Sequence, residues 1–117
     1  GEEILFALER SHSRLSDYKV LQINLAHNLS QILQDEGRYQ EALLYAKKAE
    51  NLSISGTEQF LLPEIEFSIA QILNHMQKKQ ESRMRIQSLI PYMRLIGKKE
   101  IADLAQEYLE NLTNDVN

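Results

Sequence analysis

The sequence contains no cysteine, and this absence excludes several kinds of protein at once. A chain without thiols has no disulfide scaffold, no thiolate zinc site and no cysteine nucleophile. Proline and glycine are scarce, with two and four residues among 117, which leaves room for long uninterrupted helices. The apolar runs are short, such as Phe60–Leu62. The first residues of the sequence lack the basic and apolar stretches of a secretory signal. We therefore expect no membrane span and a cytoplasmic location.

Motifs that carry catalysis are also missing. The three histidines, His12, His27 and His75, are scattered, and none lies in an H-E-x-x-H arrangement. The sequence has no glycine-rich phosphate loop and no G-x-S-x-G elbow. Carboxylate pairs such as Asp35-Glu36 are adjacent in the chain, which favours solvated helix faces over a shared cleft. We expect no enzyme activity, no cofactor and no bound metal.

The size and charge of the chain narrow the remaining classes. Its 117 residues, 43% of them hydrophobic, suffice for one domain with a modest core. A net charge of −4 disfavours direct contact with nucleic acid. The charge is uneven, because residues 77–99 carry seven basic side chains against the single acidic Glu81. A solvated helix face explains such a segment, and a contact surface for an acidic partner or a sibling domain is the alternative.

The chain matches itself at an offset near forty residues. Shifted by forty, residues 32–37 align with 72–77, and Ala42 aligns with Ser82. A shift of thirty-nine places residues 2–7 over 41–46. Such self-similarity is typical of repeat proteins, in which each unit stacks on the next. We therefore expect the chain to begin in the second helix of a repeat whose first helix is missing, as a fragment of a longer protein.

Apolar residues recur at helical spacing along nearly the whole chain, which predicts an all-α fold, an α-solenoid of about six antiparallel helices. Residues 1–117 are expected to form one domain. Its predicted parts are the second helix of a truncated repeat at 2–15, repeats at 17–54 and 57–96, and a C-terminal capping helix at 98–114.

Local signals set the expected ends of these helices. Ser16 and Asp17 offer a polar N-cap, Gly37 and Gly97 suit helix C-termini, and Pro91 should kink or end its helix. After the cap, one apolar stripe is expected to face the core. It consists of Leu21, Leu25, Leu29, Ile32 and Leu33.

One segment carries a recognisable pattern. Leu29-Ser30 is a leucine followed by a small residue, Gly37 and Tyr39 form a glycine-x-tyrosine turn, and Ala42 and Ala49 are alanines of the following helix. This pattern resembles the tetratricopeptide repeat. The resemblance implies paired helices that approach closely through small side chains, with the tyrosine filling the space beside the turn.

The second copy departs from the family pattern. Gln77, Lys79 and Ser82 stand where the family has glycine, tyrosine and alanine. The spacing near forty also exceeds the usual thirty-four, which implies longer helices or connections. Such lengthened repeats are similar to those of the cytoplasmic peptide-pheromone receptors of Gram-positive bacteria, in which a helix-turn-helix domain or a phosphatase-type helical bundle precedes the array.

The resemblance also implies a binding surface, because the first helix of each family repeat faces a concave groove. Carried over to this chain, the peptide-binding groove consists of Asn24, His27, Asn28, Gln31, Gln34, Glu64, Phe67, Ser68, Gln71 and Asn74, with His75 near the rim. Asn24, Asn28 and Gln31 follow the spacing i, i+4, i+7, so they share one helix face. Amides both donate and accept hydrogen bonds and can pair with any peptide backbone. Amides are also common on solvated faces, and that alternative stays open.

Two functions follow from these observations. The first is recognition of a polypeptide or short peptide in the groove, as the sensing part of a bacterial transcription regulator. The alternative is a structural role, in which the repeats mediate homodimerisation or act as a scaffold without a peptide ligand. In both cases we expect no direct contact of this chain with nucleic acid or membrane.

Overall fold

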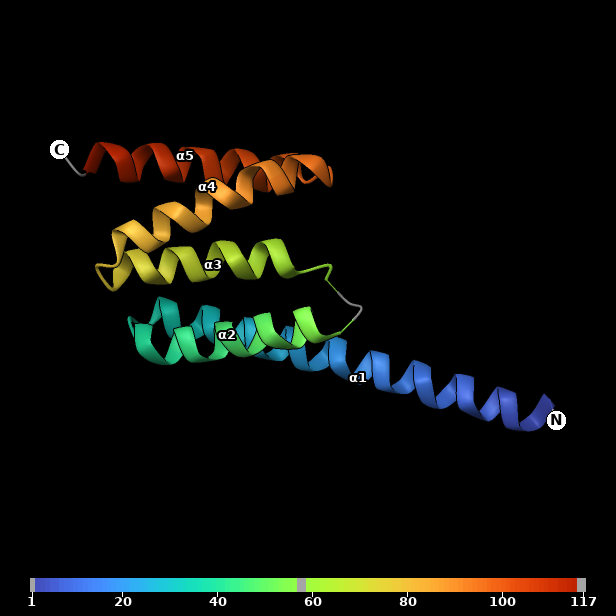
Figure 1. Cartoon of the computed structure of the whole chain (residues 1–117). Coiled ribbons are helices and arrows are strands. Elements are labelled where there is room, and N and C mark those ends of the chain that lie inside the picture. Colours follow the sequence, from blue (N-terminus) through green and yellow to red (C-terminus); the bar gives the residue numbers. More distant parts are fainter. Residues whose placement is uncertain (1, 57–58, 116–117) are drawn as a thin grey trace.

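The computed structural model describes the backbone of residues 2–56 and 59–115, and the side chains of residues 17–56 and 59–112. Within these ranges the chain is all-α, as the sequence predicts (Figure 1). The helices are α1 (Glu2–Asp35), α2 (Tyr39–Ser55), α3 (Leu62–His75), α4 (Lys79–Leu95) and α5 (Lys99–Asp115). The described ranges therefore hold five helices, where the sequence analysis expected six.

The difference in number arises because the two helices expected at 2–15 and from residue 17 onward are one helix, α1, of 34 residues. It continues through Ser16 and Asp17, where the sequence analysis expected a new helix to begin. A serine or aspartate caps a helix only where the backbone leaves helical geometry, and no glycine or proline between residues 2 and 35 favours such a break. In Figure 1 the N-terminal part of α1 projects beyond the other helices.

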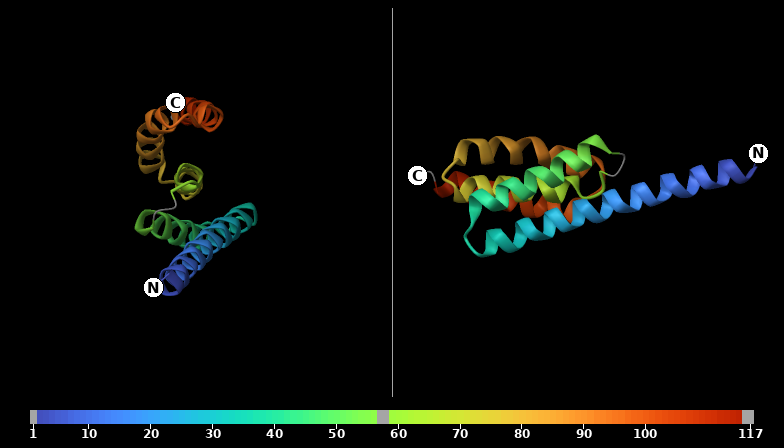
Figure 2. Two further views of the ribbon diagram at one scale, coloured as in Figure 1. Left: turned by 90° about the vertical axis from the view of Figure 1, so that its right-hand side faces the viewer. Right: turned by 90° about the horizontal axis from the view of Figure 1, so that it is seen from below.

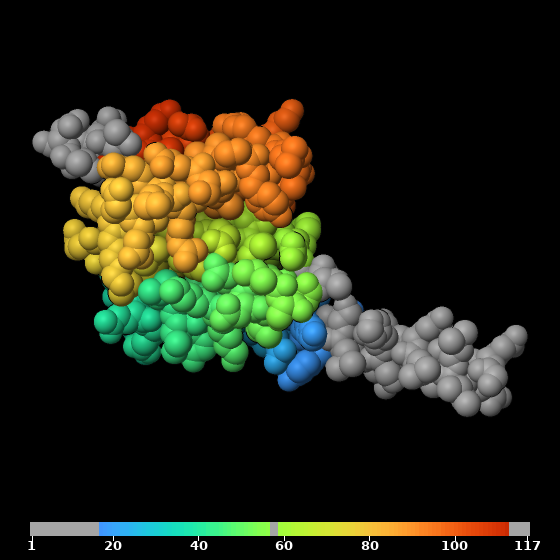
Figure 3. Space-filling view, in the orientation of Figure 1, coloured from blue at the N-terminus to red at the C-terminus, as the bar shows by residue number. Residues whose placement is uncertain are grey.

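The helices are stacked in chain order. Each contacts its neighbour in sequence, and α1 and α3 also touch. Seen end-on along the helix axes, α1, α3 and α5 lie toward one side of the stack and α2 and α4 toward the other (Figure 2, left). The space-filling view shows successive bands of colour from α1 to α5, with each band against the next (Figure 3). The result is an elongated, helical-repeat-like molecule of 68 × 31 × 18 Å.

Three of the four connections share one turn. Gly37, Gln77 and Gly97 have positive φ angles of 79°, 66° and 85°. At each turn the next amide donates to the carbonyl five residues earlier: Arg38 to Leu33 at 2.9 Å, Lys78 to Leu73 at 2.8 Å and Lys98 to Met93 at 2.8 Å. This is the Schellman C-cap, in which glycine is preferred because it adopts positive φ without strain. Gln77 therefore takes the conformation of the glycine that it replaces.

A second shared feature is a close contact between paired helices. The Oγ atom of Ser30 on α1 donates to the Ala42 carbonyl on α2 over 2.8 Å. The Oγ atom of Ser82 on α4 donates to the Ala70 carbonyl on α3 over 2.6 Å. The offset of forty places Ser30 on Ala70 and Ala42 on Ser82, so serine and alanine have exchanged helices. All four side chains are fully buried, and their small size lets the helix backbones approach.

The core consists of two clusters that meet at α3. The first fills the space between α1, α2 and α3, and the second lies between α3, α4 and α5. Pro63 lies in the first turn of α3, where its missing amide would have no partner within the helix. Pro91 lies inside α4, which continues to Leu95, so of the two expected outcomes at this proline, a kink or a helix end, the end is wrong. The buried Ile90 and Met93 on either side hold that turn against α5 and outweigh the lost hydrogen bond.

The structure buries a different stripe of α1 from the one expected. The side chains facing α2 and α3 are Ile23, Ala26, Ser30 and Leu33. Four of the five residues of the predicted stripe are exposed: Leu21 by 54%, Leu25 by 60%, Leu29 by 37% and Ile32 by 54%. The contact between Ser30 and Ala42 decides this orientation, because only the face with small residues admits α2 so closely.

No helix in residues 2–56 and 59–115 combines the length and apolar character that a membrane span requires.

Candidate binding surface

The predicted groove residues lie on α1 and α3, which belong to the same side of the stack (Figure 2). We call the surface formed there by α1, α3 and α5 the inner face. Contacts across it join all three helices. On α1 they involve His27 and Gln31, on α3 Glu64, Phe67, Ser68 and Asn74, and on α5 Tyr108.

The contact between α1 and α3 is polar. The Nε2 atom of Gln31 donates to the Oγ atom of Ser68 over 3.1 Å. His27 is half-buried on the same helix face, and this burial lowers the pKa of its imidazole, although the nearby Glu64 carboxylate opposes the shift. The Nδ1 atom of His27 and the Oε1 atom of Gln34 are buried without a hydrogen-bond partner among the described residues. This part of the inner face therefore holds polar atoms whose bonding capacity is unused.

The contact between α3 and α5 is aromatic as well as polar. The Nδ2 atom of Asn74 donates to the hydroxyl of Tyr108 over 2.9 Å. The rings of Phe67 and Tyr108 meet edge to face, with centroids 5.6 Å apart and an angle of 80° between their planes. Burial raises the pKa of the Tyr108 hydroxyl, and the bond from Asn74 works against that shift.

The sequence analysis missed Tyr108 as part of this surface; the residue lies within the segment 98–114 that was expected to form a capping helix. The available signal was the alternation of helices in a repeat stack, which puts the helix after α4 on the same side as α1 and α3. The inner face is therefore wider than predicted and has an aromatic edge.

Seven of the ten predicted residues fall into two groups. Four of them are engaged within the protein, since Gln31, Ser68 and Asn74 form the hydrogen bonds given above and Glu64 pairs with Lys98 at 2.8 Å. Asn24, Asn28 and Gln71 make no side-chain hydrogen bond within the part of the chain that the structure describes. Asn28 is exposed, and Asn24 and Gln71 are partly exposed. These three amides therefore remain available to a ligand.

His75 does not lie free at the rim. Its ring stacks on Tyr39 at the start of α2, with centroids 4.7 Å apart and planes within 2° of parallel. This contact joins the end of α3 to the first turn of α2, so His75 has a structural neighbour that the sequence analysis did not expect.

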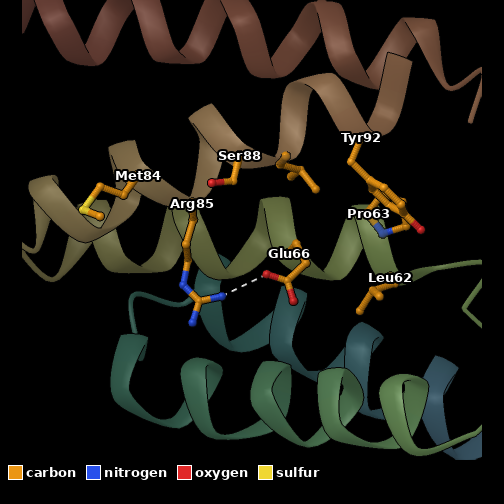
Figure 4. Close-up of a pocket in the computed structure, with 8 residues that line it drawn as sticks. Leu62, Pro63, Glu66, Met84, Arg85, Ser88 and Tyr92 are labelled. Carbon is orange, nitrogen blue, oxygen red and sulfur yellow. Dashed lines mark hydrogen bonds and ion pairs between the residues drawn. The ribbon is translucent and has the colours of Figure 1, made fainter. Parts of the chain in front are cut away.

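A separate hollow lies between α3 and α4 and has a volume of about 490 Å³ (Figure 4). Its walls are mainly apolar, and Arg85 and Glu66 supply the charged groups. The Nη1 atom of Arg85 donates to Glu66 over 2.9 Å and to Glu50 of α2 over 3.4 Å. Burial raises the pKa of Glu66 to about 7, the neighbouring Glu50 adds to the shift, and Arg85 opposes it.

Three of the seven basic side chains in the segment 77–99 form ion pairs within the protein. Arg85 is shared by Glu50 and Glu66, Lys98 pairs with Glu64, and Arg94 pairs with Asp103 at 3.1 Å. These pairs link α4 and the following turn to α2, α3 and α5. Part of this segment's charge is therefore compensated by other helices, which weakens the hypothesis of a contact surface for an acidic partner.

Comparison with known proteins adds no further evidence: no protein-family model, no curated protein and no solved structure matches this chain.

Proposed function

We propose that this chain is a tetratricopeptide-type α-solenoid that binds an extended polypeptide across its inner face. The observation that carries the proposal is the row of unengaged amides, Asn24, Asn28 and Gln71, on two adjacent helices. Each amide can donate to a peptide carbonyl and accept from a peptide amide, so together they suit backbone recognition with little demand on ligand sequence.

The inner face is held in place by its own contacts. The bond from Gln31 to Ser68 joins α1 to α3, and the bond from Asn74 to Tyr108 joins α3 to α5. A surface that is already ordered loses less conformational entropy when a ligand binds. These contacts therefore support binding without contacting the ligand themselves.

Apolar contact is available beside the amides. Phe67 is only partly buried, and its ring is oriented by Tyr108 on α5. An aromatic ring fixed by an edge-to-face contact gives a ligand side chain a large apolar surface at low entropic cost. A peptide with an apolar residue next to its amide-bonded backbone fits this arrangement.

The resemblance extends the proposal to the biological role. In the peptide-pheromone receptors of Gram-positive bacteria, a tetratricopeptide array serves as the sensing part of a regulator. We propose the same role for this chain, in the cytoplasm, with the peptide on the inner face.

The proposal is tested by selecting binders from a library of random linear peptides and measuring their affinity by calorimetry. The variant Asn28→Ala with Gln71→Ala should bind selected peptides about tenfold more weakly or worse, since each amide contributes one or two hydrogen bonds. The control is Lys47→Ala with Lys48→Ala, an exposed pair on α2. Melting temperatures of all three proteins should agree, because exposed amides add little to stability. Equal affinities in the wild type and the amide variant would refute the inner face as the binding site.

A second function is supported by another surface. The exposed apolar residues of α1 offer a contact for a second copy of the chain, which is the structural role that the sequence analysis left open.

A further inference from the structure

Over residues 17–35 the helix α1 has two apolar faces, and the described part of the chain covers only one of them. Ile23, Ala26, Ser30 and Leu33 are buried against the body of the protein. The residues that directly precede these four form a second stripe about 100° around the helix, namely Gln22, Leu25, Leu29 and Ile32. Leu25 is 60% exposed and Ile32 54% exposed, and Tyr18 extends the stripe toward the N-terminus at 59%. A helix that is apolar on two sides is normally covered on both.

The second stripe has the spacing of a coiled coil. Along α1, steps of four and three residues alternate without exception through Ile4, Leu8, Ser11, Leu15, Tyr18, Gln22, Leu25, Leu29 and Ile32. The first four of these are placed by their position in the sequence and in the helix alone. Only Ser11 and Gln22 interrupt an otherwise apolar series. A repeat of 3.5 residues kept over four heptads favours pairing with another long helix.

The stripe is complementary to itself when two copies run in opposite directions. In the antiparallel register centred between Ser16 and Asp17, paired positions add up to 33. The layers are then Ile4 with Leu29, Leu8 with Leu25, Ser11 with Gln22, and Leu15 with Tyr18, each formed twice by the two-fold axis. The two polar positions fall opposite each other, so neither is buried against an apolar layer.

Charge favours the antiparallel arrangement over the parallel one. In this heptad series Leu15 is at position a and Tyr18 at position d, so Arg14 is at position g and Lys19 at position e. In a parallel coiled coil, position g of one helix faces the following position e of the other, which places Arg14 of each chain beside Lys19 of its partner. Like charges at such positions repel. In the antiparallel register Arg14 instead flanks Leu21 of the second copy, and Lys19 flanks His12. Leu21, which is 54% exposed in the single chain, becomes covered as well.

We propose that α1 pairs with α1 of a second copy of this chain as an antiparallel two-stranded coiled coil. The helix is about 51 Å long at 1.5 Å per residue, and its N-terminal part projects beyond the stack (Figure 1). In the antiparallel pair each projecting part lies along the C-terminal half of the other α1. The two stacks of helices then lie at opposite ends of the coiled coil, with their inner faces left open.

Sedimentation equilibrium tests the pairing. The wild-type chain should sediment as a dimer, and Leu25→Glu should raise the dimer dissociation constant by at least about 100-fold. Each dimer buries this leucine twice, and burying one leucine is worth roughly tenfold or more in affinity. The matched control is Leu44→Glu on α2, where the leucine is 68% exposed but has no heptad series around it, and its dissociation constant should not change. A wild-type chain that stays monomeric at all concentrations would overturn the proposal.

Cysteine cross-linking tests the direction, and the absence of natural cysteine makes it unambiguous. Mixing Leu8→Cys with Leu25→Cys under mild oxidation should give a mixed disulfide dimer, detected by mass spectrometry of the joined peptides. Leu25→Cys alone should stay reduced, because its two copies lie 17 positions apart along the antiparallel pair. Efficient self-linking of Leu25→Cys without the mixed product would show a parallel pair and would contradict the register proposed.

Discussion

The hairpins α1–α2 and α3–α4 share a turn and a close contact, yet their surroundings differ. Ile32 and Ile72 occupy equivalent positions at the offset of forty, but Ile32 is 54% exposed and Ile72 is fully buried. Among the helices in residues 2–56 and 59–115, the second hairpin has neighbours on both sides, whereas α1 has a neighbour on one side only. The burial of a residue in this fold therefore depends on the place of its helix in the stack as well as on its type.

The position of α3 makes the same point. Seven of its fourteen residues are buried: Pro63, Ile65, Ser68, Ile69, Ala70, Ile72 and Leu73. Both core clusters include side chains from this helix, so it joins the two halves of the molecule. We expect the stability of the whole chain to be most sensitive to changes in α3.

The largest expected difference concerns the equivalent isoleucines. Ile72→Ala should lower the free energy of unfolding by about 2–5 kcal/mol, because it opens a cavity in a fully packed site. Ile32→Ala should change it by about 0.5 kcal/mol or less, because that side chain is more than half exposed. Urea unfolding followed by circular dichroism measures both, in the Leu25→Glu background so that pairing of α1 does not contribute. Similar losses for the two variants would mean that the hairpins are not packed differently.

A smaller effect should appear at the shared turn, with opposite signs in the two hairpins. Gly37→Ala should destabilise the protein by about 1 kcal/mol, since residues other than glycine are strained at positive φ. A Cβ atom at Gly37 would meet nothing within 4 Å, so the cost is conformational and not steric. Gln77→Gly should stabilise the protein by up to about 1 kcal/mol for the same reason. Thermal unfolding checks the signs, and a destabilised Gln77→Gly would show that the glutamine side chain contributes more than the backbone strain costs.

The exchanged serines allow a test by double substitution. Ser30→Ala and Ser82→Ala should each cost about 1 kcal/mol, because each removes one buried hydrogen bond. In the second hairpin, Ser82→Ala combined with Ala70→Ser recreates the arrangement of the first and should recover most of that loss. Ser88→Ala, an exposed serine on the same helix, is the control. If the double variant is less stable than Ser82→Ala alone, the two contacts are not interchangeable.

A further expected difference between the hairpins is a pH dependence that involves Glu66 of the second hairpin. The pKa of Glu66 rises from an ordinary 4.5 to about 7 in the folded protein, so between these values the folded state binds more protons than the unfolded state. Its contribution to stability is complete below about pH 4.5 and is lost as the pH rises toward 7. Glu66→Gln should therefore flatten the fall in stability across this window, measured by urea unfolding at a series of pH values. His27, whose pKa is lowered, acts in the opposite direction in both proteins and cancels in their difference.

A variant that follows the wild-type pH curve between pH 4.5 and 7 would contradict the burial of the Glu66 carboxyl as the cause. The corresponding position in the first hairpin is Ala26, which has no charge to titrate. The pH dependence is thus a property of the cluster of Glu50, Glu66 and Arg85, which joins α2, α3 and α4.

The sequence indicated which residues could form the candidate surface, but it did not indicate which of them form hydrogen bonds within the protein. Sequence spacing placed Asn24, Asn28 and Gln31 on one face of a helix, which follows from helical geometry alone. It did not show that Gln31 bonds to Ser68 or that Asn74 bonds to Tyr108, because these partners are 37 and 34 residues apart in the chain. The pairing of Arg85 with Glu50 and Glu66 was hidden for the same reason.

The sequence by itself determined the helical class, the internal offset of forty and the turns at Gly37 and Gly97, since these depend on local periodicity and on the conformational preference of glycine. The tertiary structure decided which face of α1 is buried, because both of its stripes are apolar and only the one with Ser30 and Ala26 lets α2 approach closely. It also decided that Ser16 and Asp17 lie within a continuous helix and that Gln77 takes the place of a glycine. At Gln77, a local preference of about 1 kcal/mol for glycine was overruled by the packing of whole helices.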